Sequence, residues 1–293
     1  MMLGRLDGRL HNSPCTDIFL ARARLEGAAA LAMLAGVPIR VRDLQDWISG
    51  RTPPPRASEG LNDPVSVAAV FHFSLSRDDD LPDPVLTATL KALRTLLDDR
   101  SEAEMWGSGD LAYFGPMWRI VRQHADAPFD RRDLLAVAER IFEIAEITRA
   151  PAAERSDITS PDGRTLSITS RARDRLWVIG TALPLMLYRA GITSRVIPSM
   201  ILLPKFLPDS PTTLVEAMFA ALEKVIFPAI RDLEALERRL ATKLATLDAT
   251  KRSHAPLLAR LMLAYPGLQS KAVARLLDIT PQGARKLLAR VAL

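Results

Sequence analysis

The sequence is poor in the residues that build metal sites and disulfides. Cys15 is the only cysteine among 293 residues, so an intramolecular disulfide and a cysteine-based zinc site are excluded. The four histidines, His11, His72, His124 and His254, have no paired spacing, so we expect no metal ion. Aromatic residues make up only 5% of the chain, and alternating β-branched patterns are scarce. An extensive sheet is therefore not expected.

Long hydrophobic runs are also missing. The longest, Leu176 to Tyr188, contains Gly180 and Pro184 and is shorter than the roughly 20 apolar residues that a membrane-spanning helix needs. Charged residues interrupt the first ten positions, so the apolar stretch of a signal peptide is absent. These observations predict a cytoplasmic protein with no membrane partner.

Positive charge is concentrated at the C-terminal end. Residues 251–293 carry eight bases and one acid, a net charge of +7, whereas the other 250 residues hold 31 bases and 33 acids, a net charge of −2. Such a concentration of positive charge indicates a polyanionic partner, and double-stranded DNA is the first candidate. Together with the polar stretch 248–253, it predicts a helical body of unknown function over 1–250 and a DNA-binding domain over 251–293.

Helical periodicity dominates the body. We expect a mainly α, multi-helical body with one short β-hairpin, followed by a small tri-helical module. The hairpin is expected from Ile158 to Thr169, around an Asp-Gly turn at 161–163. The expected helices are Thr16 to Ala35, Val41 to Ile48, one capped by Asp83 with Pro84 in its first turn, one capped by Asp130 and reaching Thr148, Arg171 to Tyr188, Val196 to Leu203, and Thr212 to about Leu247.

The last of these helices carries a leucine stripe. After Pro228 the leucines recur at intervals of three and four residues, at Leu233, Leu236, Leu240, Leu244 and Leu247. Two interpretations stay open: the stripe packs on the protein's own chain, or the helix over 229–247 forms a homodimer seam of about two heptads.

The C-terminal 43 residues contain the pattern of a helix-turn-helix unit. Gln269 to Leu277 and Pro281 to Leu288 are typical of two short helices joined by a tight turn, with Thr280 as the cap of the second. Ala274 is small where the helices cross, and Ala284 faces back onto the first helix. The turn position that is usually glycine is Asp278, which must adopt a left-handed conformation or widen the turn. A preceding helix, Ala255 to Tyr265, completes a tri-helical core.

In such a unit the second helix enters the major groove of DNA. Arg285 is the best candidate for a guanine contact, and Lys271 and Lys286 are candidates for phosphate contacts. The full set of predicted DNA-binding residues is Lys271, Arg275, Thr280, Gln282, Gly283, Arg285, Lys286 and Arg290. The sequence therefore predicts a sequence-specific DNA-binding protein, a transcriptional regulator.

Several stretches carry a family resemblance. They are Arg22 to Gly27, Trp47 to Arg51 with the prolines that follow, Glu59 to Pro64, and the helix-turn-helix unit. Their layout resembles a Fic-like helical family of unknown function with a C-terminal helix-turn-helix, typical of plant-associated alphaproteobacteria and their plasmids. The resemblance spans most of the chain and implies a Fic-like scaffold for the body.

The catalytic motif of Fic enzymes is absent. The stretch from Arg22 to Gly27 resembles the Fic inhibitory helix, but no His-Pro-Phe followed by an acidic residue and Gly-Asn-Gly-Arg occurs in the chain. Nucleotide transfer then lacks both its histidine base and its phosphate-binding loop. We predict no catalytic residue, no metal and no cofactor. A Fic-scaffold enzyme, active or decayed, and a protein-interaction module with a basic tail stay as alternatives.

Other possible catalytic groups favour structural interpretations. His72 lies in an apolar run, as expected of a core histidine, and Asp78 to Asp80 resembles a solvated loop. Gly107-Ser108-Gly109 lacks the lysine of a phosphate-binding loop. Cys15 has no evident histidine partner, so we expect it to be inert.

Overall fold

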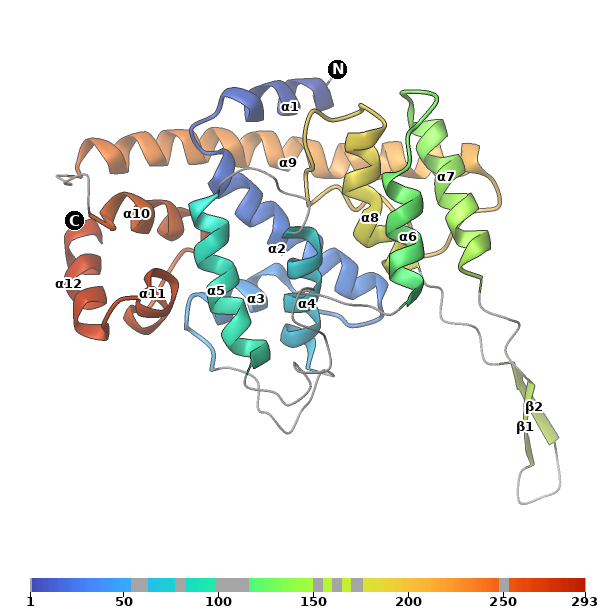
Figure 1. Ribbon diagram of the computed structural model, residues 1–293, viewed down its shortest axis with the longest axis horizontal. Helices are drawn as coiled ribbons and strands as arrows, with labels where there is room; N and C mark the ends of the chain where they lie inside the picture. Colours follow the sequence, from blue (N-terminus) through green and yellow to red (C-terminus); the bar gives the residue numbers. More distant parts are fainter. Residues whose placement is uncertain are drawn as a thin grey trace.

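A computed structural model describes residues 2–53, 63–76, 83–98, 116–149, 155–159, 165–169, 176–247 and 253–292. Over these residues the chain is mainly helical, as the sequence predicts (Figure 1). The described helices are α1 (Met2–Asn12), α2 (Thr16–Leu34), α3 (Val41–Ile48), α4 (Pro64–Ser76), α5 (Pro84–Asp98), α6 (Pro116–Asp126), α7 (Leu134–Ile147), α8 (Leu176–Arg189), α9 (Pro211–Ala245), α10 (Ala255–Ala264), α11 (Ser270–Leu277) and α12 (Pro281–Ala292).

Two short strands are also described. β1 (Arg155–Thr159) pairs antiparallel with β2 (Thr165–Thr169), with Arg155 opposite Thr169 and Thr159 opposite Thr165. The expected Asp-Gly turn at 161–163 lies outside the described residues.

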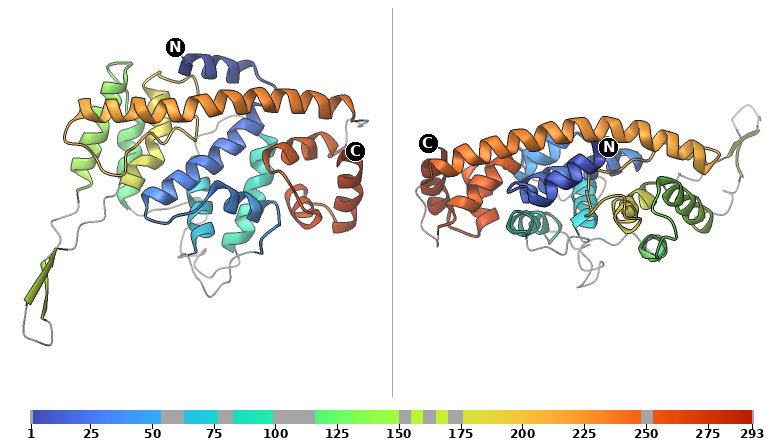
Figure 2. Two further views of the ribbon diagram at one scale, coloured as in Figure 1. Left: turned by 180° about the vertical axis from the view of Figure 1, so that it is seen from behind. Right: turned by 90° about the horizontal axis from the view of Figure 1, so that it is seen from above.

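The longest helix, α9, runs along one side of the molecule and joins its two ends (Figures 1 and 2). Helix α7 packs near its N-terminal half, α1 and α2 contact it along its length, and α10 lies against its C-terminal half. Ser210 caps α9 by accepting a hydrogen bond from the Thr213 amide at 3.2 Å, and Pro228 lies inside the helix. The helix therefore acts as a common support for the body and the C-terminal segment.

The leucine stripe of α9 belongs to the protein's own core. Leu233, Leu236 and Leu240 are all buried, whereas Leu244, near the C-terminal end of the helix, is exposed. These three leucines belong to the hydrophobic cluster of the same chain, which favours the first of the two interpretations of the stripe.

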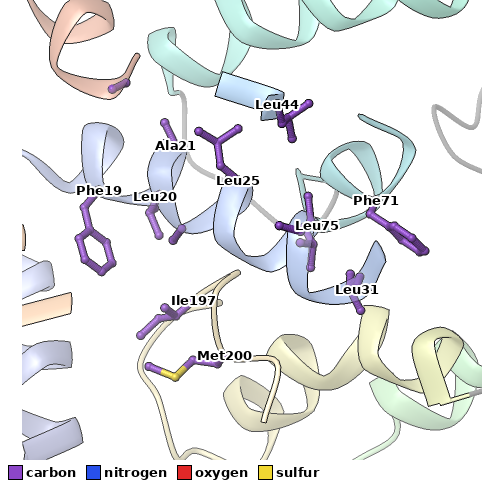
Figure 3. Close-up of a cluster of buried hydrophobic side chains, with 14 of the residues drawn as sticks. Phe19, Leu20, Ala21, Leu25, Leu31, Leu44, Phe71, Leu75, Ile197 and Met200 are labelled. Carbon is purple, nitrogen blue, oxygen red and sulfur yellow. The ribbon is translucent and has the colours of Figure 1, made fainter. Parts of the chain in front are cut away.

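The buried helix α2 lies at the centre of the body. Its side chains meet α3, α4 and an irregular segment over 196–203, as Figure 3 shows for Leu25, Leu44, Leu75 and Met200. The packing is closest at Gly27, where an added Cβ atom would lie 2.2 Å from the Pro198 carbonyl oxygen. Only a glycine allows α2 to pass this segment at backbone distance.

The prediction of a helix over 196–203 is wrong. The segment is buried but irregular, and Ile197 and Met200 each expose only 1% of their surface. Pro198 supplies no amide hydrogen and clashes with a preceding helical turn, and Pro204 follows directly. An apolar sequence thus fills the core here without regular structure.

At the starts of α5 and α7, the predicted capping residues can be compared with the observed ones. Asp83 caps α5 as expected, because its Oδ1 accepts a hydrogen bond from the Leu86 amide at 2.9 Å. The prediction of Asp130 as the next cap is wrong. Asp133 accepts from the Ala136 amide at 2.7 Å, and α7 begins only after it. Either aspartate satisfies the sequence rule for a cap, and the rest of the structure selects the later one.

The body and the C-terminal helices share one hydrophobic core. The boundary expected at 248–253 is described only at Ser253, and buried apolar residues on both sides of it form a single continuous cluster. Helix α10 packs on α2, α5 and α9, and α11 packs on α5. The C-terminal segment is docked on the body along most of its inner side.

Candidate nucleic-acid interface

Helices α11 and α12 form two short helices joined by a tight turn. The turn is made by Asp278, whose φ of 55° and ψ of 48° lie in the left-handed region. Aspartate tolerates this conformation better than most residues with a side chain. The Ile279 amide then donates to the Ala274 carbonyl at 3.0 Å, closing the end of α11. The sequence left two options for this position, and the left-handed one is observed.

Thr280 caps the second helix as predicted. Its Oγ1 accepts a hydrogen bond from the Gly283 amide at 3.1 Å, and Pro281 occupies the first position of α12. An added Cβ at Gly283 would lie 3.2 Å from that Oγ1, so Gly283 gives the cap room. Both residues thus have a structural role at the start of the helix.

The tri-helical core holds α12 at a fixed position. Ala284 is fully buried, and Val291 is buried about two turns further along the same face of α12. They belong to the same apolar cluster as Leu258 and Leu261 of α10 and Val273 of α11. Since α10 also packs on the body, the orientation of α12 depends on the whole molecule.

The opposite side of α12 is exposed, and we call it the outer face. It contains four of the predicted residues, and no acidic side chain occurs in α12. Helix α12 lies at the edge of the molecule in every view, so the helices of the body leave this side open (Figures 1 and 2). The residues are Gln282, Arg285, Lys286 and Arg290. Lys271, at the start of α11, is exposed as well.

Arg275 does not share this exposed setting, and its prediction as a DNA contact is not supported by its position. Its guanidinium carbon lies 5.0 Å from the ring centroid of Trp47 in α3. Burial lowers the pKa of the guanidinium, and Nε has no hydrogen-bond partner among the described residues. The contact is a cation–π interaction that docks α11 on the body.

One basic residue near the turn was missed by the sequence analysis. Lys91 of α5 is exposed and its Nζ lies 3.9 Å from Asp278 Oδ2. It therefore adds positive charge beside the turn between α11 and α12. No local pattern could have revealed it, because α5 and α11 are far apart in the sequence and meet only in the folded chain.

His72 and Cys15, which the sequence analysis considered for catalysis, are both buried. His72 is fully buried, and burial lowers its pKa to about 3. Cys15 is buried too, and its pKa is raised to about 11, which keeps the thiol protonated at neutral pH. Asp78 to Asp80 and Gly107 to Gly109 lie outside the described residues. Within the described segments, no group of three or more histidine, cysteine or acidic side chains is placed to hold a metal ion.

Comparison with known proteins returns no relative. No family model, no curated protein and no solved structure matches the chain. In the described ranges, no helix combines the length and the apolar character that crossing a bilayer requires. The geometry of α10 to α12 is therefore the main guide to function.

Proposed function

We propose that the protein binds double-stranded DNA in a sequence-specific manner and regulates transcription. The outer face of α12 carries the argument. It projects glutamine, arginine and lysine side chains from a helix that follows a capped tight turn, with no acid in the helix. Arginine pairs with guanine and glutamine pairs with adenine in the major groove, so this set can read base edges.

The contacts divide into two kinds. Gln282 and Arg285, in the first turns of α12, approach base edges, whereas Lys271 and Lys286 approach phosphates. About four to six phosphate contacts give a slope of roughly −4 to −5 when the logarithm of the binding constant is plotted against that of the salt concentration. Thr280 and Gly283 contribute by fixing the start of the helix.

The test uses the full chain, because the C-terminal helices share their core with the body. A preferred duplex is first selected from a random library, and its affinity and that of a random duplex are then measured over a range of salt concentrations. Arg285→Ala should weaken the free energy of binding to the preferred duplex by about 1–3 kcal/mol and that to the random duplex by much less. Lys271→Ala should weaken both alike and reduce the salt slope by about one.

Lys224→Ala is the matched control. Lys224 is an exposed lysine on α9. This variant removes the same positive charge away from the outer face and should bind both duplexes as the wild type does. A wild-type chain without affinity for any duplex at low salt contradicts the proposal. If Arg285→Ala loses the same affinity for both duplexes, the outer face binds DNA without sequence preference, and the sequence-specific part of the proposal is wrong.

A further inference from the structure

A pocket lies where the body meets the C-terminal helices. Its volume is about 620 Å³, within the range of small-molecule sites. The end of α1, the start of α2, the start of α5, the loop around residue 195 and the first turns of α10 form its walls. The outer face of α12 is not part of it, so the pocket is separate from the proposed DNA contacts.

The two carboxylates in the pocket wall already have cationic partners. Asp17 Oδ1 accepts a hydrogen bond from Arg260 Nη1 at 2.7 Å. Asp83 pairs with the buried Arg24 at 3.3 Å through Oδ2, and its Oδ1 accepts from the amide that it caps. Neither carboxylate therefore has an unmatched negative charge to offer a cationic ligand.

Arg195 is the charged group of the wall that lacks a partner. Its Nε is buried and makes no hydrogen bond, and no ion pair of Arg195 occurs among the described residues. A guanidinium that is partly withdrawn from water and unpaired has a strong preference for an anion.

The remaining wall is largely apolar. Leu20 of α2, Pro84 of α5 and Pro256 and Leu257 of α10 supply it. One unmatched positive charge beside an apolar wall fits a ligand with one negative charge and a hydrocarbon body. A carboxylate matches the fork of a guanidinium with two parallel hydrogen bonds.

We propose that this pocket binds a small organic carboxylate with an apolar body, whose carboxylate group pairs with Arg195. The apolar body lies against Leu257 and Pro84, so the ligand touches both α10 and the body of the protein. Binding there stabilises the docked arrangement of α10, because a ligand that binds only the folded state raises stability. The inference is independent of the proposed DNA binding.

The experiment measures binding to the full chain without DNA. Benzoate and hexanoate are titrated by calorimetry at neutral pH, and their neutral amides, benzamide and hexanamide, serve as matched probes. Both carboxylates should bind and raise the unfolding temperature, and the amides should bind at least about ten-fold more weakly. Arg195→Gln should weaken carboxylate binding about ten- to a hundred-fold. Arg195→Lys should recover part of that loss, because it keeps the charge without the fork.

Arg231→Gln on α9 is the control, since it removes an exposed arginine that does not line the pocket. Circular dichroism establishes that each variant is folded. Equal binding of the acids and their amides overturns the proposal, as does wild-type affinity in Arg195→Gln. Binding of inorganic phosphate without binding of either carboxylate overturns it too, because the apolar wall would then have no role.

Discussion

At the scale of single residues, a buried polar cluster stands out in the otherwise apolar centre of the body. Arg24 of α2 pairs with Asp83 at the start of α5, and both side chains are almost fully buried. His72 of α4 is buried nearby, and Arg24 opposes its protonation. The Nε2 atom of His72 has no partner among the described residues. Removal of one charged partner from such a cluster lowers the free energy of unfolding more than removal of one partner from a surface ion pair does, because the remaining charge stays buried.

The low pKa of His72 predicts a loss of stability in acid. The folded state keeps the imidazole neutral down to about pH 3, whereas the unfolded chain binds a proton near pH 6.5. Stability from this residue is therefore complete above pH 6.5 and decreases as the pH falls toward 3. Between pH 7 and pH 4.5, His72→Phe should lose about 2–3 kcal/mol less unfolding free energy than the wild type. Urea unfolding at both pH values measures this difference.

The comparison of the two proteins is itself the control, because all carboxylates titrate in both. Phenylalanine suits the apolar surroundings, and the Ser76 hydroxyl keeps its hydrogen bond to the carbonyl of residue 72. An identical loss of stability in both proteins contradicts a buried neutral histidine.

At the scale of elements, the turn between α11 and α12 is the place where local geometry has a clear energetic cost. Asp278 is the only described non-glycine residue with a positive φ. It is exposed, and its ion pair with Lys91 is long, so this pair stabilises the turn only weakly. The left-handed backbone is therefore maintained by the packing of the two helices and not by the side chain itself.

Replacement of Asp278 by glycine should therefore stabilise the protein. Glycine adopts a φ of 55° without steric cost, and its greater freedom in the unfolded chain offsets part of the gain. We expect Asp278→Gly to add about 0.5–1 kcal/mol to the free energy of unfolding, measured by urea denaturation. Asp278→Val should lower it by more than 1 kcal/mol, since a β-branched side chain is poorly accommodated there. A stabilising Asp278→Val would contradict the left-handed turn.

Elements fixed by local rules could be predicted from the sequence, and elements fixed by distant contacts could not. The starts of helices α10 to α12 were predicted to within one residue, because Thr280, the helical periodicity and the turn at Asp278 act within a few positions, although α12 continues past Leu288 to Ala292. Helices α1, α4 and α6 were missed. The polar and charged faces of α1 and α6 hide short apolar stripes, which become buried only against α9 and α8 respectively. Helix α4 is buried along almost its whole length, so it has no polar face to show a helical period. The segment 196–203 was taken for a helix because burial alone produces the same apolar composition.

The candidate site shows the same division. The exposed position of Arg285 and Lys286 follows from the helical period and the buried Ala284, all within α12. The inward position of Arg275 depends on Trp47, which belongs to α3 and is brought close only by folding. Charge counting alone treats all these arginines alike, so it could not separate the exposed ones from the docked one.

At the scale of the whole molecule, the C-terminal helices are joined to the body by polar contacts as well as by the core. Arg22 of α2 donates to the Leu263 carbonyl at 2.6 and 3.0 Å and pairs with Asp232 of α9. The hydroxyls of Tyr265 and Thr89 lie 2.8 Å apart in a buried hydrogen bond. The bonds to Leu263 and Tyr265 connect the end of α10 to α2 and α5. Basic composition marks out the last 43 residues, but their folding is tied to the rest of the chain.

The shared core predicts that the protein unfolds as one unit. Leu258 of α10 is fully buried, and Leu258→Ala should cost about 2–5 kcal/mol of unfolding free energy. All four tryptophans lie before residue 250, so their fluorescence reports on the body and, through Trp47 beside Arg275, on the docking of α11. If the protein unfolds in a single cooperative transition, the variant shifts the unfolding midpoints measured by tryptophan fluorescence and by circular dichroism by the same amount. Lys286→Ala, on the outer face, should leave the free energy of unfolding measured by either probe within about 0.5 kcal/mol of the wild-type value. If Leu258→Ala unfolds part of the helical signal early while the fluorescence transition stays in place, the C-terminal helices are an independent domain.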